Sequence, residues 1–135
     1  MIEIRAALYS KLISDTALIS ELGGDTAIYY GIAPQGTARP YVVFFNAGGG
    51  PENTYPSDLT SEVYVVKAVA DSMGGALTVD NACKTALHKQ TLDLTATGYT
   101  NIWTRRENEV SLTEVSDDGT VIRHEGAYYR IRVDN

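Results

Sequence analysis

The sequence predicts an α+β fold, a single-domain sandwich whose mostly antiparallel sheet carries two main helices on one face. Three observations predict it. Helical spacing of apolar residues occurs near the N-terminus and again in the middle of the chain, and segments rich in β-branched and aromatic residues follow each time. Asp117-Asp118-Gly119-Thr120 separates two alternating segments near the C-terminus, which is typical of a hairpin. The length of 135 residues fits one domain covering residues 1–135.

Two stretches are predicted to be the main helices. The first is indicated by apolar residues that share one helical face: Ile4, Ala7, Leu8 and Leu12. Asp15 then caps a second, short helical turn that Gly23-Gly24 ends. The other main helix is expected from Met73 to about Gln90, on the spacing of Leu77, Ala82, Cys83, Ala86, Leu87 and Gln90.

The strands are expected in the remaining apolar segments: Ile28–Tyr30, Tyr41–Phe45, Ser61–Ala70, Tyr99–Arg105, Glu109–Val115 and Val121–Val133. The second and third of these are apolar on both faces. Each is therefore expected to be covered by helices on one side and by another layer or subunit on the other. Gly126 is a candidate for a β-bulge. The glycine- and proline-rich residues 47–59 are predicted to form an irregular loop, and loops this long tend to be functional or disordered.

Composition and charge exclude several classes of protein. The chain is 44% hydrophobic and 21% charged, which is typical of globular proteins and excludes collagen-like and fully disordered chains. Its 17 acidic against 11 basic residues give a net charge of −6, which argues against a nucleic-acid binder. A single cysteine cannot form an internal disulfide. We find neither a membrane span nor a signal peptide, and expect a soluble protein that folds in the cytoplasm.

The residue types used in catalysis are not arranged for it. Cys83 and His88 lie five residues apart on the predicted helix, so their side chains point to different faces. We expect Cys83 to be a buried structural thiol and His124 to be a solvated surface residue. Glu107 and Glu109 would share one face of a strand, but the neighbouring arginines indicate a charged, wet stretch rather than a catalytic pair.

Metal and phosphate sites are not predicted either. The sequence has no CxxC, HExxH or EF-hand spacing. Gly48-Gly49-Gly50 lacks both the GxGxxG spacing and a GK[ST] ending, so a flexible loop is favoured over a phosphate-binding loop. We therefore predict no catalytic, cofactor-binding or metal site, and a protein that is not an enzyme.

Several segments, which together span most of the chain, match one known family in their order and in their residue types. They are ALYSKLISDTALISELGG, IYY, APQGTARPYVVFF, SEVYVVKAVA, TALHKQTL and RHEGAYYRIRV. In this order they resemble the small tail-completion, or tail-terminator, proteins of long-tailed bacteriophages and phage-derived particles. The resemblance implies a small α/β sandwich.

The resemblance also implies a structural role in virion assembly. Such a protein forms a ring, generally a hexamer, that caps the finished tail tube, stops its polymerisation and offers the surface on which the head docks. DNA passes through the central hole without sequence-specific binding. The implied partners are further copies of the chain, the tail tube protein and a head-completion or connector protein, with no cofactor and no membrane. The implied location is the head–tail interface of the virion, after assembly in the host cytoplasm.

The residues suit this role. Nine tyrosines against two phenylalanines favour interface surfaces, because tyrosine combines apolar area with a polar tip. The acidic balance suits a conduit that does not retain DNA. Candidate surfaces for the tube or the head are the 47–59 loop and the hairpin around Asp117-Asp118-Gly119. The candidate interface residues are Asn53, Tyr55, Glu107, Glu109, Asp117 and Asp118.

Other functions remain open at this stage. A head-side connector or stopper protein would also form a ring. A small cytoplasmic enzyme or ligand-binding domain would use the glycine loop at residues 48–50. A third alternative is an adaptor that binds one host protein as a monomer.

Overall fold

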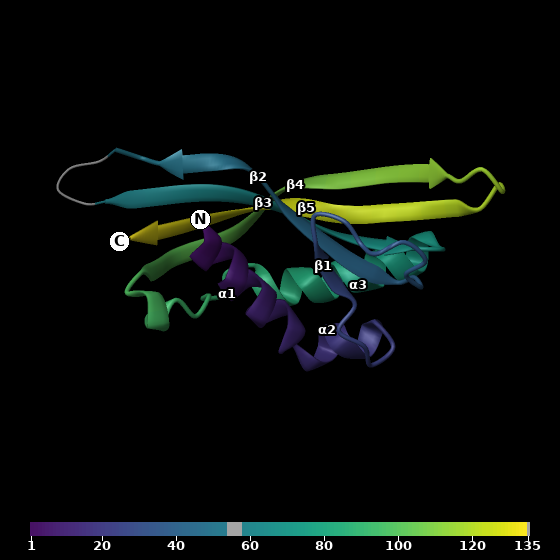
Figure 1. The fold of residues 1–135 in the computed structure, drawn as a ribbon, viewed down its shortest axis with the longest axis horizontal. Helices are drawn as coiled ribbons and strands as arrows, with labels where there is room; N and C mark the ends of the chain where they lie inside the picture. Colours follow the sequence, from purple (N-terminus) through teal and green to yellow (C-terminus); the bar gives the residue numbers. More distant parts are fainter. Residues whose placement is uncertain (54–57, 135) are drawn as a thin grey trace.

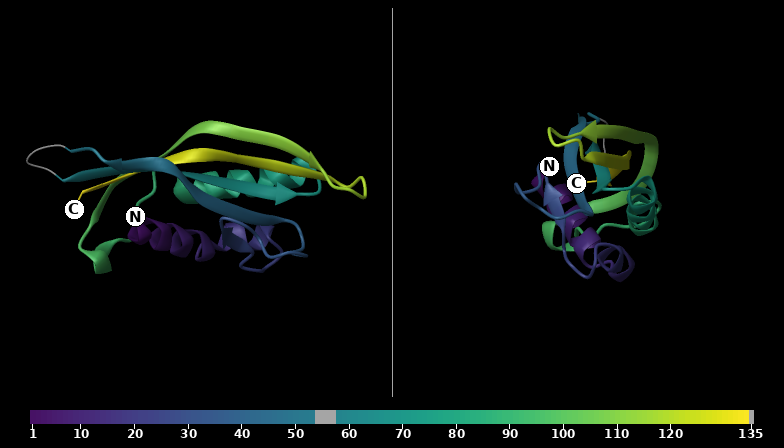
Figure 2. Two further views of the ribbon diagram at one scale, coloured as in Figure 1. Left: turned by 45° about the horizontal axis from the view of Figure 1, so that its top comes forward. Right: turned by 90° about the vertical axis from the view of Figure 1, so that its right-hand side faces the viewer.

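The computed structural model describes residues 1–53 and 58–134 and confirms the α+β fold (Figure 1). The helices and strands are α1 (Ile2–Ile13), α2 (Thr16–Glu21), β1 (Ile28–Tyr30), β2 (Tyr41–Pro51), β3 (Leu59–Ala70), α3 (Met73–Leu87), the 3₁₀ turn η1 (Thr95–Thr97), β4 (Thr100–Val115) and β5 (Val121–Asp134). The strands form one sheet in the order β1-β2-β3-β5-β4, in which only β1 and β2 are parallel. The helices lie on one face of this sheet (Figure 2).

Helices α2 and α3 begin where the sequence predicts, because side-chain caps satisfy one of their first backbone N–H groups. Asp15 Oδ1 accepts from Leu18 N at 2.9 Å, and Ser72 Oγ accepts from Gly75 N at 3.0 Å. Helix α3 ends at Leu87, earlier than the expected Gln90. Just beyond the end of α3, Lys89 has a positive φ of 60°. Its N–H donates to Thr104 O at 2.9 Å, which turns the chain toward β4.

The core lies between the helices and the inner face of the sheet. The predicted alternation of the last strand is confirmed, since its inward residues are fully buried: Ala127, Tyr129, Ile131 and Val133. Phe44 and Tyr64 supply the largest aromatic side chains from β2 and β3. The helices contribute Ile4, Leu8, Leu12, Leu18 and Leu87. Burial of this apolar surface is the main stabilising term of the fold.

The prediction of an irregular loop over residues 47–59 was wrong at both ends of that range, because β2 continues to Pro51 and β3 begins at Leu59. Glycine allows the pairing. A register shift lies between Asn46 and Gly48, and Gly49 has a φ of 98° opposite Glu62. A Cβ at Gly49 would stand 2.2 Å from Ser61 O, so only glycine permits this approach of the two backbones.

The two strands expected around residues 99–105 and 109–115 are one strand, β4, with a bulge. Arg106 pairs with Tyr129 and Glu109 with Ala127, so β4 uses one residue more than β5 over this step. The candidate bulge at Gly126 was wrong, because the β5 register is regular there. Gly126 instead permits a close approach, since a Cβ would stand 2.3 Å from Val66 O.

The outer face of the sheet carries no helix in the part of the chain that the structure describes (Figure 2). Val43, Val65 and Val69 point to this face and are nevertheless buried. Because no helix covers them, neighbouring side chains of the same strongly twisted sheet shield them. The expected second layer of the chain is therefore absent among the described residues, and cover by another subunit stays a prediction. Leu112 and Tyr128 remain exposed on this face by 44% and 36%.

Candidate functional site

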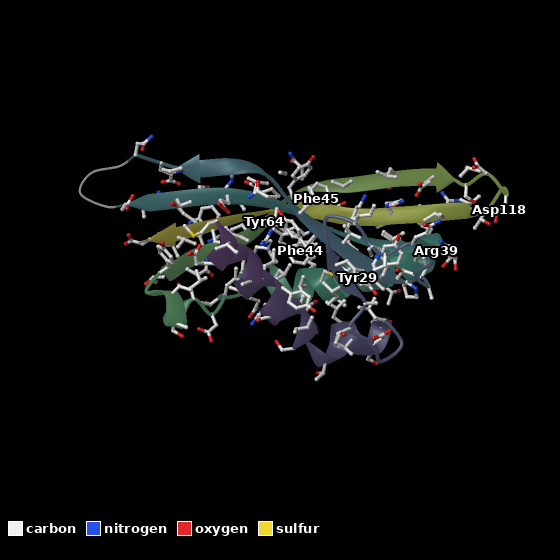
Figure 3. All side chains as sticks on the ribbon, in the orientation of Figure 1. Tyr29, Arg39, Phe44, Phe45, Tyr64 and Asp118 are labelled. Carbon is white, nitrogen blue, oxygen red and sulfur yellow. The ribbon has the colours of Figure 1, made fainter. Side chains whose placement is uncertain are left out.

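The β2–β3 and β4–β5 hairpins end at opposite ends of the longest axis of the molecule (Figure 1). Each end carries residues predicted to meet partners. Asn53 lies at the β2–β3 end and Asp118 at the far end of the β4–β5 hairpin (Figure 3). The structure therefore separates the two groups of candidates as widely as the fold allows.

The β4–β5 turn has a fixed shape. The predicted hairpin is confirmed, with Ser116 N donating to Thr120 O at 2.9 Å and Gly119 at a φ of 86°. Asp118 Oδ1 accepts from Thr120 N at 3.0 Å and from the Ser116 hydroxyl. These hydrogen bonds, that from Ser116 foremost, lower the pKa of Asp118 to about 2, so the carboxylate stays ionised. Asp117 is exposed at the same tip.

The β2–β3 end is described only in part. Asn53 is exposed and has a positive φ of 56°, a conformation that asparagine tolerates better than most residues. Glu52 beside it forms an ion pair with Arg132 of β5 at 2.8 Å. Tyr55 lies outside the described residues.

The bulge in β4 separates the two carboxylates that the sequence placed on one strand face. Glu107 pairs with Arg130 at 3.1 Å, whereas Glu109 lies 3.7 Å from Arg106 and is 78% exposed. Arg130 and Arg106 belong to opposite faces, since Arg106 reaches the inward Tyr129 and Arg130 follows it along β5. The expectation of a shared face was wrong because the extra residue inverts the alternation.

A buried ion pair at this bulge was missed by the sequence reasoning. The Arg106 guanidinium donates to Asp80 of α3 at 2.9 and 2.7 Å and to the Tyr129 hydroxyl at 2.9 Å. Its backbone N–H donates to His88 Nδ1 at 3.0 Å. These contacts fix β4 to α3 where the strand changes register. Asp80 interrupts the apolar face of the predicted helix, which was the available signal.

The possible catalytic groups are kept apart. Cys83 is buried in the core, and its burial raises the pKa of the thiol. Desolvation and the nearby cations, Lys89 foremost, lower the pKa of His88, whose ring accepts from a backbone N–H. His124, expected at the surface, is buried, and its Nε2 lies 2.8 Å from Glu114 Oε1, because β4 covers that edge of β5.

No three His, Cys, Asp or Glu side chains within the described residues are grouped to hold a metal ion. None of the helices in residues 1–53 and 58–134 combines the length and apolar character that crossing a bilayer requires.

The chain is similar to a known protein family and to a solved structure. The chain matches the family described as Tail completion protein gp17 over residues 6–134. Its structure is similar to a chain of a solved structure described as the virion of a native gene transfer agent (GTA) particle, with a TM-score of 0.77 and 19% sequence identity. That match covers 98% of this chain and 95% of the other and shows a common fold. A search of the curated proteins gave no match.

The sequence-based resemblance to tail-completion proteins is thereby confirmed, over almost the whole chain. The chain belongs to the tail completion protein gp17 family: it is a structural protein of the virion tail, not an enzyme.

Proposed function

We propose that this protein caps the end of the tail tube as a closed ring of six copies, stops tube polymerisation and forms the surface that joins the tail to the head. The observation that carries the proposal is the placement of the two hairpin ends. A subunit of a joining ring needs separate surfaces for other virion proteins and for its neighbouring copies, and this chain has its exposed ends at the opposite limits of its longest axis (Figure 1). In this proposal the β2–β3 end meets the tail tube protein or a head-completion protein, and the β4–β5 end contacts the next copy.

Lateral contacts between copies complete the ring. A closed ring requires that one side of each copy contacts a different side of the next. The outer face of the sheet has no covering helix within the described residues, and Tyr128 and Leu112 are exposed on it. Exposed tyrosine is typical of the central part of protein interfaces. These features favour a chain that buries further surface on assembly.

The charge of the chain is consistent with passage of DNA through the ring. Each copy has a net charge of −6. Lysine and arginine side chains would hold the phosphate backbone through counterion release, whereas an acidic lumen repels it. DNA is therefore expected to move through the opening without being bound.

Electron microscopy of tails made with and without this chain tests the proposal. Without it, we expect tubes of variable and mostly greater length that carry no head, and the wild-type chain supplied in trans should restore both length and joining. Tubes of unchanged length that still join heads in its absence would refute the proposal. Normal tube length with unjoined heads would instead place the protein on the head side, as a connector.

A further inference from the structure

A mixed aromatic, aliphatic and basic surface lies beside the start of α1. We call it the α1–β1 patch, and it consists of Ile2, Arg5, Tyr9, Tyr30 and Ile32. The first three residues share one side of α1, because their spacing is three and then four residues. Tyr30 ends β1, and Ile32 follows it after one glycine. Ile2 is 65% exposed and Ile32 is 83% exposed.

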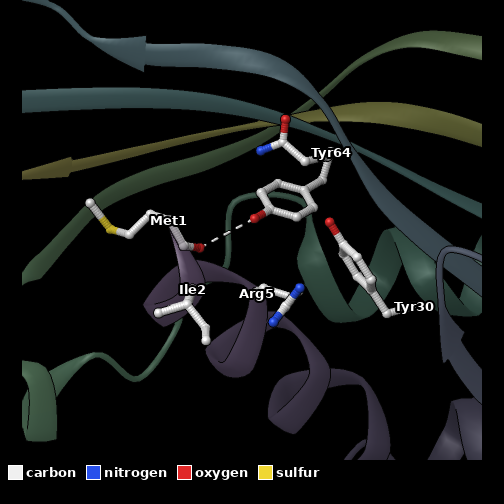
Figure 4. Close-up of a pocket in the computed structure, with 6 residues that line it drawn as sticks. Met1, Ile2, Arg5, Tyr30 and Tyr64 are labelled. Atoms are coloured by element: carbon white, nitrogen blue, oxygen red, sulfur yellow. Dashed lines mark hydrogen bonds between the residues drawn. The ribbon is translucent and has the colours of Figure 1, made fainter.

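A pocket of about 230 Å³ opens in this patch (Figure 4). Its lining combines Ile2 with hydrogen-bonding groups of Arg5, Tyr30, Asn46 and Tyr64. Burial raises the pKa of Tyr64 to about 12, and its hydroxyl donates to the Met1 carbonyl oxygen at 3.4 Å. The aromatic rings hold the wall in place, since Tyr30 packs edge-on against Phe44 with ring centres 5.3 Å apart. The lining includes the guanidinium of Arg5, which suits an anionic group.

Arg5 is the charged member of this lining. Its guanidinium lies 4.6 Å from the centre of the Tyr30 ring, a cation–π contact. In the described part of the chain, no carboxylate forms an ion pair with Arg5. The buried Glu62 nearby contacts the Met1 amino group and Asn46 instead. Arg5 is thus a fixed cation at the mouth of a pocket, with its charge available to a partner.

The tip of the β4–β5 hairpin has the complementary chemistry. Residues 112–121 contain three carboxylates and no lysine or arginine. Their apolar members are exposed, Leu112 by 44%, Val115 by 66% and Val121 by 38%. Asp117 is exposed at the turn and has no hydrogen bond or ion pair within the described residues. The tip therefore offers a free carboxylate flanked by aliphatic side chains.

One molecule cannot bring these two surfaces together. The tip lies at one end of the longest axis, while α1 begins in the other half of the molecule (Figures 1 and 3). We propose that the α1–β1 patch of one copy receives the β4–β5 tip of the next copy, with Asp117 paired to Arg5 in the pocket and the exposed aliphatic side chains packed around them. This contact rests on the proposed ring and deepens it. It joins two different surfaces, which is the type of contact that closes a ring.

Cysteine cross-linking in assembled tails tests the contact directly. The double variant Ile32→Cys/Asp117→Cys, treated with a short bis-maleimide, should give a ladder of multimers that ends at the number of copies in the ring. Either single variant should stay monomeric, because the contact joins unlike surfaces. Cys83 is 1% exposed and does not compete for the reagent. A visible ring without a ladder, or dimers from a single variant, would overturn the contact while leaving the proposed function intact.

A charge swap provides an independent test. Arg5→Glu and Asp117→Arg should each lower the fraction of capped tails about tenfold, which corresponds to about 1.4 kcal/mol per contact. The double variant should recover most of this loss. Lys84→Glu and Glu21→Arg make the same charge changes at exposed positions away from both surfaces and should have little effect. Unchanged melting temperatures show that the variants fold.

The charge swap also distinguishes a second copy of the chain from other possible partners of the α1–β1 patch. If Arg5→Glu abolishes capping and Asp117→Arg on the same chain does not compensate, an acidic segment of another virion protein fills the pocket, and the proposal is wrong. If neither variant changes capping, the patch has no role in assembly.

Discussion

Replacing Asp80 by leucine is expected to destabilise the protein strongly, because it leaves the Arg106 cation buried without its counterion. The two side chains are only 10% and 8% exposed and share two hydrogen bonds, of 2.7 and 2.9 Å. After the substitution Arg106 keeps the Tyr129 hydroxyl at 2.9 Å and the exposed Glu109 at 3.7 Å. Neither replaces a bidentate carboxylate.

The size of the effect follows from the burial. Removing one partner of a buried ion pair costs roughly 3–5 kcal/mol. We expect about 3 kcal/mol, at the lower end, because Tyr129 and Glu109 still contact the guanidinium. For a chain of 135 residues, one kcal/mol lowers the melting temperature by roughly 3.5 °C, so the variant should melt about 10 °C lower.

Urea unfolding and thermal melts of four proteins measure this cost: the wild type, Asp80→Leu, Arg106→Met and the double variant. The double variant removes both charges and should lie within about 1 kcal/mol of the wild type, since apolar side chains of similar volume replace buried ion pairs well. The exposed pair Arg39–Asp71 is the matched control, and Asp71→Ala should cost less than about 1 kcal/mol. A loss below about 1 kcal/mol for Asp80→Leu, or a double variant as unstable as the single one, would refute the reasoning.

Three further predictions concern single residues. The pKa of Asp118 is lowered from 3.8 to about 2, so the stability that its carboxylate gives the turn is complete above pH 4 and lost as the pH falls toward 2; carboxyl NMR titration should find the midpoint near 2. Gly126→Ala should cost about 2 kcal/mol or more in urea unfolding because its Cβ would meet the β3 backbone, whereas Gly74→Ala, with open space around it, should stabilise α3 slightly. Cys83 should not react with a thiol reagent at pH 8 until the protein is unfolded, because burial raises its pKa.

Hydrophobic periodicity in the sequence predicted much of the fold. The apolar spacing of α1 and the alternation in β5 marked residues that the structure buries. On α3 the predicted face was only half right, because Cys83, Ala86 and Leu87 are buried but Leu77 is 48% exposed. Asp15 and the Asp-Gly turn worked as local signals because capping and turn geometry depend on only a few neighbouring residues. These parts of the fold are determined locally, and the sequence shows them.

Features that depend on pairing between distant segments were not predictable. Gly48 and Gly49 disfavour a strand locally, but both adopt a positive φ here, and the β3 backbone lies too close to Gly49 for any side chain. The bulge at Glu107 follows from the register with β5, which no single segment contains. The Arg106–Asp80 pair joins residues 26 positions apart, so the sequence around either residue does not indicate its partner. For the candidate site, sequence placed the β4–β5 tip correctly but gave no reason to single out Arg5 and Tyr30.

The central place of β5 in the sheet also has a consequence for synthesis. This strand pairs with β3 on one side and β4 on the other, and it is the last strand to leave the ribosome. Until it arrives, β1, β2 and β3 are without their neighbour, and the long edge of β3 is open to other unfinished chains. Its contacts span up to 75 residues, from Leu59 to Asp134, which favours slow folding. High-level expression is therefore expected to yield aggregates of incomplete chains at elevated temperature, and slower translation should raise the recovery of folded protein.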